Sequence, residues 1–227
     1  MVHLIFVCKY RKKLLEKFDK EIKQIFIDIS IKYKFCDGYN IRWSASAWDI
    51  PSIHFLLDYD IPFLKIPSAC TNDHVLLEEA ASSGIPIYLS TGMTSSDELC
   101  TAMNILGSSV STILHCVSGY PTPVEQSNLN KLVTLHSMYP KCRLGYSGHE
   151  IAWLPTLIAR SLGAEVIERH FTIDTSLWGT DQFLSLDPIE FARLKRMLDS
   201  IPEILGNGKL EIQESELGAM NKLRRKI

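Results

Sequence analysis

The sequence lacks a long hydrophobic run, although 46% of its 227 residues are hydrophobic. A membrane-spanning helix needs about 20 consecutive apolar residues, and no stretch of the chain approaches that length. The apolar start of the chain is followed by basic residues and has no small-residue cleavage site, so it does not resemble a secretory signal peptide. We therefore expect a cytoplasmic protein without a membrane partner.

Close cysteine pairs and a strong charge of either sign are also missing. The six cysteines form no C-x-x-C motif, which favours reduced, mostly buried thiols over a disulfide framework. The net charge of −2 and the pI near 6.4 do not favour a nucleic-acid partner. No G-x-G-x-x-G motif follows a predicted strand, which weakens a dinucleotide-binding interpretation.

From residue 41 onward, short strand-like runs alternate with longer amphipathic stretches. The pattern predicts strands at residues 41–45, 63–66, 87–90, 112–116, 143–147 and 165–170. It predicts helices at residues 51–58, 73–83, 95–107, 124–138, 153–163 and 188–205. This alternation indicates an α/β fold with parallel strands, either a doubly wound sheet or a (β/α)₈ TIM barrel. Six units are visible where a barrel has eight, so a barrel would be incomplete.

Residues 1–40 have a different composition from the rest of the chain. A strand is predicted at residues 1–10 and an amphipathic helix at residues 12–34, and a turn is predicted at residues 36–40. The first 35 residues carry nine of the chain's 24 Lys and Arg residues. We therefore predict a domain boundary near residue 40, with residues 1–40 as a strand–helix segment unrelated to residues 41–227.

Polar side chains gather at the carboxyl ends of the predicted strands, where the active site of a TIM barrel lies. The candidates are Lys65, Ser68, Ser90, Ser118, Tyr120, Ser147, His149, Glu168 and His170. Serines and a lysine that converge there would bind phosphate and carboxylate oxygens. Any one serine is better explained by strand termination or helix capping. Five strand ends together favour a site.

His149 and His170 are 21 residues apart, the length of one strand–helix–strand unit. This spacing places them at the same level on neighbouring strands, where they can share a divalent ion such as Mn²⁺. On spacing alone, two structural histidines are the better explanation, because two ligands are a weak signal for a metal. Lys65 has a second interpretation too, because a lysine inside a barrel can form a Schiff base, as in metal-independent aldolases.

Several motifs, in order and with their spacing, resemble the N-acetylneuraminate (sialic acid) synthase family. They are SASAWD (44–49), FLKIPSA (63–69), YLSTGM (88–93), HCVSGYPTP (115–123), GYSGHE (145–150), IERHFT (167–172) and GTDQFLSLDP (179–188). The resemblance covers about 180 residues and corresponds to strands three to eight of that family's barrel. It implies a cytoplasmic, homodimeric transferase of sialic acid biosynthesis that condenses phosphoenolpyruvate with N-acetylmannosamine or a related N-acetylated sugar aldehyde.

The resemblance also implies roles for individual residues. His149 and His170 match the family's two Mn²⁺ ligands, and Glu168 matches a catalytic acid. The positions that match phosphoenolpyruvate contacts are Lys65, Ser68, Ser90, Ser118 and Ser147. Tyr120 and Asp181 match positions that face the sugar.

The chain departs from the family at both ends. Strands one and two of the family barrel, with a catalytic glutamate and a lysine, have no match, and we expect the family's C-terminal antifreeze-like domain to be absent. Residues 1–36 resemble instead the start of small single-tyrosine transposases, which indicates a possible fusion. We therefore expect impaired synthase activity. The alternatives are an inactive remnant or ligand-binding pseudoenzyme, and a barrel lyase that uses Lys65 as a Schiff base.

Overall fold

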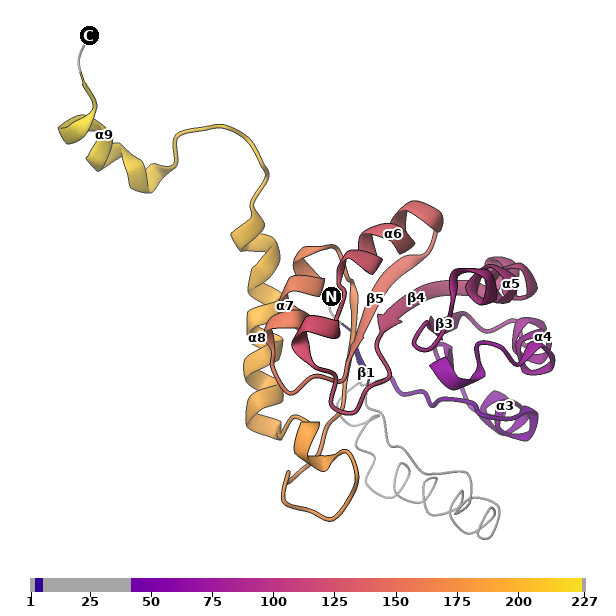
Figure 1. The fold of residues 1–227 in the computed structure, drawn as a ribbon. Coiled ribbons are helices and arrows are strands. Elements are labelled where there is room, and N and C mark those ends of the chain that lie inside the picture. Colours follow the sequence, from indigo (N-terminus) through magenta and orange to yellow (C-terminus); the bar gives the residue numbers. More distant parts are fainter. Residues whose placement is uncertain (1–2, 6–41, 226–227) are drawn as a thin grey trace.

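Six parallel strands form one sheet in the order β1-β6-β5-β4-β3-β2 in the computed structural model, which describes residues 3–5 and 42–225 (Figure 1). The strands are β1 (His3–Ile5), β2 (Leu64–Ile66), β3 (Ile87–Ser90), β4 (Val110–Cys116), β5 (Arg143–Gly148) and β6 (Val166–Arg169). The sheet is curled. Three strands lie between β2 and β6, yet Lys65 on β2 contacts Glu168 on β6. The predicted fold class, an incomplete TIM barrel, is confirmed.

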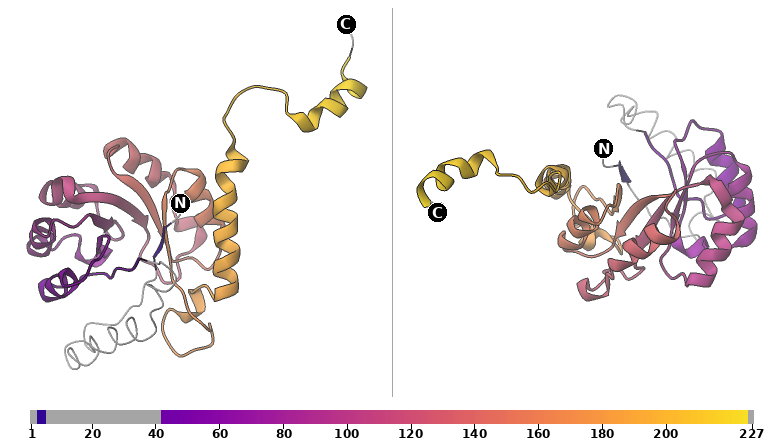
Figure 2. Two further views of the ribbon diagram at one scale, coloured as in Figure 1. Left: turned by 180° about the vertical axis from the view of Figure 1, so that it is seen from behind. Right: turned by 90° about the horizontal axis from the view of Figure 1, so that it is seen from above.

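The helices lie on the outer side of the curled sheet (Figure 2). They are α3 (Ile50–Leu57), α4 (His74–Ser82), α5 (Ser96–Leu106), α6 (Asn130–Met138), α7 (Leu154–Ser161) and α8 (Pro188–Leu205), and α9 (Leu217–Leu223) follows them. Short 3₁₀ turns are η1 (Ser68–Cys70), η2 (Gly107–Ser109), η3 (Val124–Gln126), η4 (Gln182–Leu184) and η5 (Glu214–Glu216). Each crossover therefore places a helix outside and leaves the concave side of the sheet for the site.

Local sequence explains where the long helices begin and end. Ser95 and Glu98 form a reciprocal capping box at the start of α5, and Gly107 ends that helix with a φ of 55°. At α8, the Asp187 carboxylate accepts hydrogen bonds from the backbone of the first turn, and Pro188 follows at the first helical position. These signals made α8 predictable to the residue.

Two predicted elements need correction. Residues 42–45 form no strand, because the Ser44 hydroxyl donates to the Phe63 carbonyl that a neighbouring strand would use. A single parallel bridge, Ser46 to Lys65, remains there. The helix predicted at residues 124–138 is divided into η3 and α6, because Asn128 adopts a left-handed φ of 43° that interrupts the helix.

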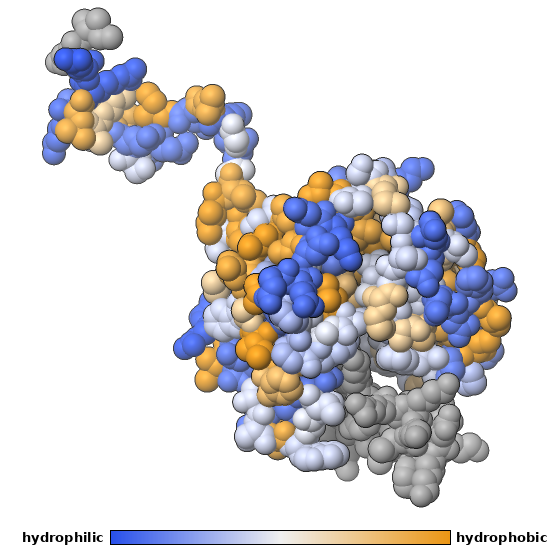
Figure 3. Space-filling view, in the orientation of Figure 1, coloured by the Kyte–Doolittle hydropathy of each residue, from blue (hydrophilic) through white to orange (hydrophobic). Residues whose placement is uncertain are grey.

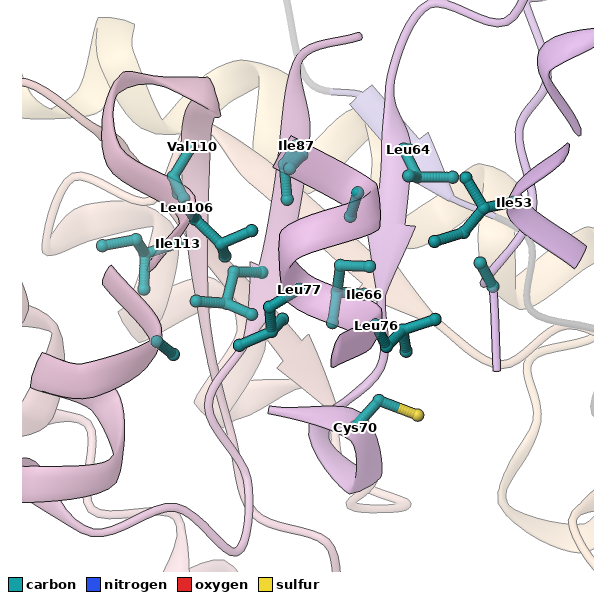
Figure 4. Packing of buried hydrophobic residues seen from close by; sticks show 14 of the residues in the cluster. Ile53, Leu64, Ile66, Cys70, Leu76, Leu77, Ile87, Leu106, Val110 and Ile113 are labelled. Atoms are coloured by element: carbon teal, nitrogen blue, oxygen red, sulfur yellow. The ribbon is translucent and has the colours of Figure 1, made fainter. Parts of the chain in front are cut away.

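The main core lies between the sheet and helices α3 to α5 (Figure 4). Leu64 and Ile66 of β2, Ile87 of β3 and Ile113 of β4 are fully buried there against the helices. A second cluster joins Ile167 of β6 to α7 and α8. These outward-facing residues alternate along each strand with residues that face the interior of the curled sheet.

A small apolar layer closes the lower part of that interior. It consists of Phe63, Tyr88, Leu114 and Val166, which pack together. The Phe63 and Tyr88 rings are stacked with centroids 3.9 Å apart. Two residues after each of the four, the next side chain that faces the interior is polar or a cysteine. These next residues are Lys65, Ser90, Cys116 and Glu168. The apolar layer therefore supports a polar layer above it.

After α8 the chain leaves the barrel, and residues 206–225 extend away from it (Figure 1). Hydrophobic residues gather on this extension and over the α7 and α8 side of the barrel (Figure 3). Exposed examples are Leu154, Ile158, Ile204 and Leu210. Within the described residues, no helix is both long and apolar enough to cross a membrane.

Residues 1–40 are described only at β1, which pairs in parallel register with β6 so that Ile5 lies opposite Glu168. The predicted helix at residues 12–34 and the turn at 36–40 lie outside the described residues. The predicted boundary near residue 40 and the possible fusion therefore stay predictions.

Candidate functional site

Five interior side chains form the polar layer at the carboxyl end of the sheet. They are Lys65, Ser90, Cys116, Ser147 and Glu168, each from a different strand and each buried. Cys116, Ser147 and Glu168 lie side by side in register across β4, β5 and β6. The parallel arrangement therefore brings together residues that are up to 103 positions apart.

Glu168 is the centre of this layer. Its carboxylate lies 3.1 Å from the Lys65 ammonium and accepts a hydrogen bond of 2.8 Å from the Ser147 hydroxyl. Burial by itself raises the pKa of Glu168, but Lys65, Ser147 and His149 together outweigh it, so the pKa lies below the ordinary value. The layer therefore holds a fixed cation beside a fixed anion, both removed from water.

A second group of polar atoms surrounds Gly92, just after β3. The Gly92 backbone N–H donates to the Ser68 hydroxyl at 3.0 Å, and the Ser68 hydroxyl lies 3.0 Å from the Cys116 thiol. A Cβ at Gly92 would lie 2.4 Å from the Ser118 hydroxyl and 2.7 Å from the Cys116 sulfur. Only glycine fits among these side chains, and we call Gly92 with Ser68, Cys116 and Ser118 the Gly92 cradle.

Ser90 supplies a hydroxyl to the same region. Its side chain is 2% exposed, and its Oγ atom has no hydrogen-bond partner among the described residues. A buried hydroxyl without a partner is costly, which favours a site whose ligand satisfies it. Ser90 therefore indicates that the polar layer binds a molecule with acceptor oxygens.

The two histidines stand at the upper edge of the polar layer. Their ring centroids are 5.3 Å apart, and the rings are nearly perpendicular at 82°. His149 Nδ1 donates to the Val117 carbonyl at 2.8 Å, and His170 Nδ1 lies 3.7 Å from an Asp181 carboxylate oxygen. Metal-binding histidines commonly use one ring nitrogen in this way and ligate through the other.

Tyr120 lies over both histidines at the mouth of the site. Its ring centroid is 4.3 Å from that of His149 and 5.9 Å from that of His170. Burial, Cys116 and Asp181 raise the pKa of Tyr120 to about 12, so the phenol keeps its proton at neutral pH. It is 37% exposed, whereas both histidines are buried, so it can be reached by a second substrate.

The two histidine side chains can bind a divalent metal only if water or a substrate supplies the remaining ligands. Within residues 3–5 and 42–225, no group of three or more His, Cys, Asp or Glu side chains could hold a metal ion. Two imidazoles 5.3 Å apart supply two nitrogen ligands, and the other positions would need water or substrate oxygens. Such a partly open site is typical of catalytic metals rather than structural ones.

All ten site residues predicted from the sequence lie in or beside this one region. Sequence reasoning missed Gly92 and Cys116, although both lie in motifs it used, YLSTGM and HCVSGYPTP. Cys116 shares strand parity with Leu114, which was the available signal. It also missed Glu150 and Arg169, which form a buried ion pair that faces away from the site.

Comparisons of the sequence with known proteins point to one family. Residues 26–210 match the NeuB family. The chain is 37% identical over 162 residues to N-acetylneuraminate-9-phosphate synthase of Drosophila melanogaster, covering 70% of this chain and 44% of that protein. It is 33% identical over 201 residues to N,N'-diacetyllegionaminic acid synthase of Legionella pneumophila, covering 86% of this chain and 56% of that protein.

A solved structure gives the same result. The N-acetylneuraminic acid (sialic acid) synthetase of Leptospira borgpetersenii, crystallised with citrate, superposes with a TM-score of 0.78 at 33% identity. The alignment covers 99% of this chain and 81% of that one. The chain spans about half the length of the curated relatives named above. The match over residues 26–210 and the shared fold show that the chain belongs to the NeuB family.

Proposed function

We propose that this chain carries the reaction centre of a nonulosonic acid synthase, which condenses phosphoenolpyruvate with an N-acetylated sugar aldehyde such as N-acetylmannosamine. The observation that carries the proposal is the polar layer together with the group around Gly92, where a buried lysine, several hydroxyls and a backbone N–H converge beside two histidines. Relatives named as sialic, legionaminic and pseudaminic acid synthases support the reaction class.

Phosphoenolpyruvate suits the charge and the hydrogen-bonding groups of this layer. The ligand carries a carboxylate and a phosphate, and Lys65 supplies a cation with little water to compete. Ser68, Ser118 and Gly92 offer one cluster of polar contacts, and Ser90 on β3 and Ser147 on β5 each add a buried hydroxyl. We assign Lys65, Ser68, Ser90, Ser118 and Ser147 to phosphoenolpyruvate binding, with the anionic groups held so that the enol carbon faces the histidines.

We assign His149 and His170 as the protein ligands of a divalent metal, with Mn²⁺ the preferred ion. When bound, such an ion acts as a Lewis acid that polarises the sugar aldehyde. The protein itself orients the two imidazoles, His149 through Val117 and His170 through Asp181. Tyr120 and Asp181 lie on the outer side of these rings, and we assign them to the sugar.

The reaction then requires three bond changes at the enol. C3 of phosphoenolpyruvate bonds to the aldehyde carbon, and positive charge develops at C2. Water adds at C2, and phosphate leaves as the bond between C2 and the bridging oxygen breaks, so the new ketone oxygen comes from water. Glu168 is anionic, and we propose that its carboxylate stabilises the charge at C2 and accepts a proton from the added water.

Two other functions would use some of the same residues. A Schiff-base lyase needs a neutral, nucleophilic Lys65. Lys65 is held in an ion pair with the Glu168 carboxylate at 3.1 Å, and a nucleophilic lysine would have to leave that pair, which weighs against this function. A ligand-binding pseudoenzyme would keep phosphoenolpyruvate affinity without turnover, and the two behaviours separate in one assay.

The test uses phosphoenolpyruvate labelled with ¹⁸O at the bridging oxygen, together with Mn²⁺ and N-acetylmannosamine. The synthase reaction places the label in phosphate and forms a nonulosonic acid, both detected by mass spectrometry. Label in pyruvate would indicate a phosphatase and contradict the proposal. Binding without any product would identify a pseudoenzyme, and borohydride trapping of pyruvate on Lys65 would identify the lyase.

A further inference from the structure

Strands β5 and β6 carry a second polar cluster on the side that faces away from the site. Successive side chains on a strand point to opposite faces, so the residues between the site residues point outward. Tyr146 of β5 and Arg169 of β6 point outward and meet Glu150, which follows β5, and Thr156 of α7, and we call these four residues the outer cluster. Each is at most 2% exposed. The outer cluster is therefore as deeply buried as the site itself.

The Glu150 carboxylate is the acceptor at the centre of the outer cluster. It accepts hydrogen bonds from the Tyr146 hydroxyl at 3.0 Å, the Thr156 hydroxyl at 2.9 Å and Arg169 Nη1 at 3.2 Å. Burial lowers the pKa of Arg169, and Glu150 opposes this shift. Both charges are compensated by a partner and by several hydrogen bonds, as buried charges must be.

Arg169 also binds the backbone that follows β5. Its guanidinium donates to the carbonyl oxygens of Glu150 and Ala152, and to the Thr156 hydroxyl at 2.8 Å. Arg169 directly precedes His170, and Glu150 directly follows His149. The ion pair thus joins the two strand ends that carry the histidines, from the side opposite the histidine rings.

Gly148 shows that the chain makes room for this contact. A Cβ at Gly148 would lie 2.8 Å from both Glu150 carboxylate oxygens and 3.0 Å from the Tyr146 ring. The glycine therefore allows the Glu150 carboxylate to fold back beneath the end of β5. A buried ion pair is weak evidence for stability, because well-packed apolar residues often stabilise as well or better. A geometric role explains its presence more fully.

We propose that Arg169 and Glu150 are positioning residues, which fix the separation and orientation of His149 and His170 and thereby set the metal affinity of the site. The inference rests on the proposed function, because it takes these histidines as the metal ligands. Neither Arg169 nor Glu150 contacts the interior of the barrel. They act through the backbone that they hold.

The experiment compares two substitutions on β6. Arg169→Lys keeps the charge but loses the planar fork that reaches several acceptors at once. Ile167→Ala is the matched control, because Ile167 is fully buried on the same outward face of β6. Thr156→Val is a milder change that keeps Arg169 and removes two hydrogen bonds of the Thr156 hydroxyl, one to Glu150 and one from Arg169. For each protein, Mn²⁺ affinity, melting temperature and the imidazole NMR signals of the metal-free protein are measured.

We expect Arg169→Lys to raise the Kd for Mn²⁺ by roughly ten- to hundredfold. The signals of His149 and His170 should shift, while that of the exposed His54 on α3 should not. Thr156→Val should act in the same direction with a smaller effect. Ile167→Ala should lower the melting temperature and leave both the Kd and the histidine signals unchanged.

Equal losses of melting temperature, with wild-type Kd and histidine signals in Arg169→Lys, would overturn the inference. If Arg169→Lys does not fold, Thr156→Val decides by the same two readouts. If the wild-type protein does not bind Mn²⁺, the proposed metal site fails. The histidine signals then still decide whether Arg169 positions the two rings, because they need neither metal nor turnover.

Discussion

The Lys65 ammonium lies 3.1 Å from the Glu168 carboxylate, and each side chain is only 6% exposed. The two residues lie on β2 and β6, which are separated by three strands in the sheet. Their contact therefore crosses the interior of the curled sheet rather than running along it. The ion pair joins the two halves of the barrel at the level of the site.

The first prediction concerns this pair. Glu168→Gln leaves a buried ammonium without its anion and should lower the free energy of unfolding by about 3–5 kcal/mol. The double variant Lys65→Met/Glu168→Gln should lose less than the sum of the single variants, because it removes both charges. Denaturant unfolding measures each value. Additive losses would mean that the two charges do not interact.

The second prediction follows from the lowered pKa of Glu168. An unperturbed glutamate has a pKa of about 4.3, so the folded state holds fewer protons than the unfolded state near that pH. The stability from this group is therefore present above pH 4.3 and is lost as the pH falls through the lower, folded-state pKa. The melting temperature of Glu168→Gln should depend less on pH below about 4.3 than that of the wild type. Parallel curves would contradict the assignment.

The third prediction concerns the cradle around Gly92. Gly92→Ala places a methyl group 2.4 Å from the Ser118 hydroxyl and 2.9 Å from the Ser68 hydroxyl. Overpacking of this kind costs about 1–3 kcal/mol. Because the methyl group pushes the two hydroxyls away from the ligand, we expect a loss of this size in binding free energy, a roughly ten- to hundredfold fall in phosphoenolpyruvate affinity. Gly119→Ala is the control, since its Cβ would meet no atom closer than 3.5 Å. Calorimetric titration gives both affinities, and equal values would place the anion elsewhere.

The fourth prediction separates the two substrates. Because the pKa of Tyr120 is about 12, its phenol is a hydrogen-bond donor at neutral pH. Tyr120→Phe should raise the KM for N-acetylmannosamine roughly two- to tenfold, the value of one hydrogen bond. The Kd for phosphoenolpyruvate should stay unchanged. A change in phosphoenolpyruvate affinity alone would remove Tyr120 from the sugar side.

Much of the fold could be predicted because its signals are local. The strands of a parallel sheet are buried on both faces and read as short apolar runs, as residues 87–90 do. The bounds of α8 follow from Asp187, Pro188 and Gly206. Residues 42–45 were wrongly predicted as a strand because their backbone partner, Phe63, is engaged by a side chain that the local pattern does not reveal.

The candidate site could be predicted in its members but not in its contacts. Strand parity places Ser147, His149, Glu168 and His170 on one face. It does not show that Glu168 meets Lys65, 103 residues away, because that contact depends on the curl of the whole sheet. Gly92 could not be assigned for the same reason, since its role depends on side chains from η1 and from β4 and the loop after it.

One measurement tests the central claim, that a single site holds both phosphoenolpyruvate and a metal at His149 and His170. The ³¹P NMR relaxation of phosphoenolpyruvate bound to the protein is recorded with Mn²⁺, and Mg²⁺ serves as the diamagnetic control. We predict strong paramagnetic relaxation of the bound ligand in the wild type, and its loss in His149→Gln with phosphoenolpyruvate still bound. Bound phosphoenolpyruvate that Mn²⁺ does not relax, or relaxation that persists in His149→Gln and His170→Gln, would contradict the account.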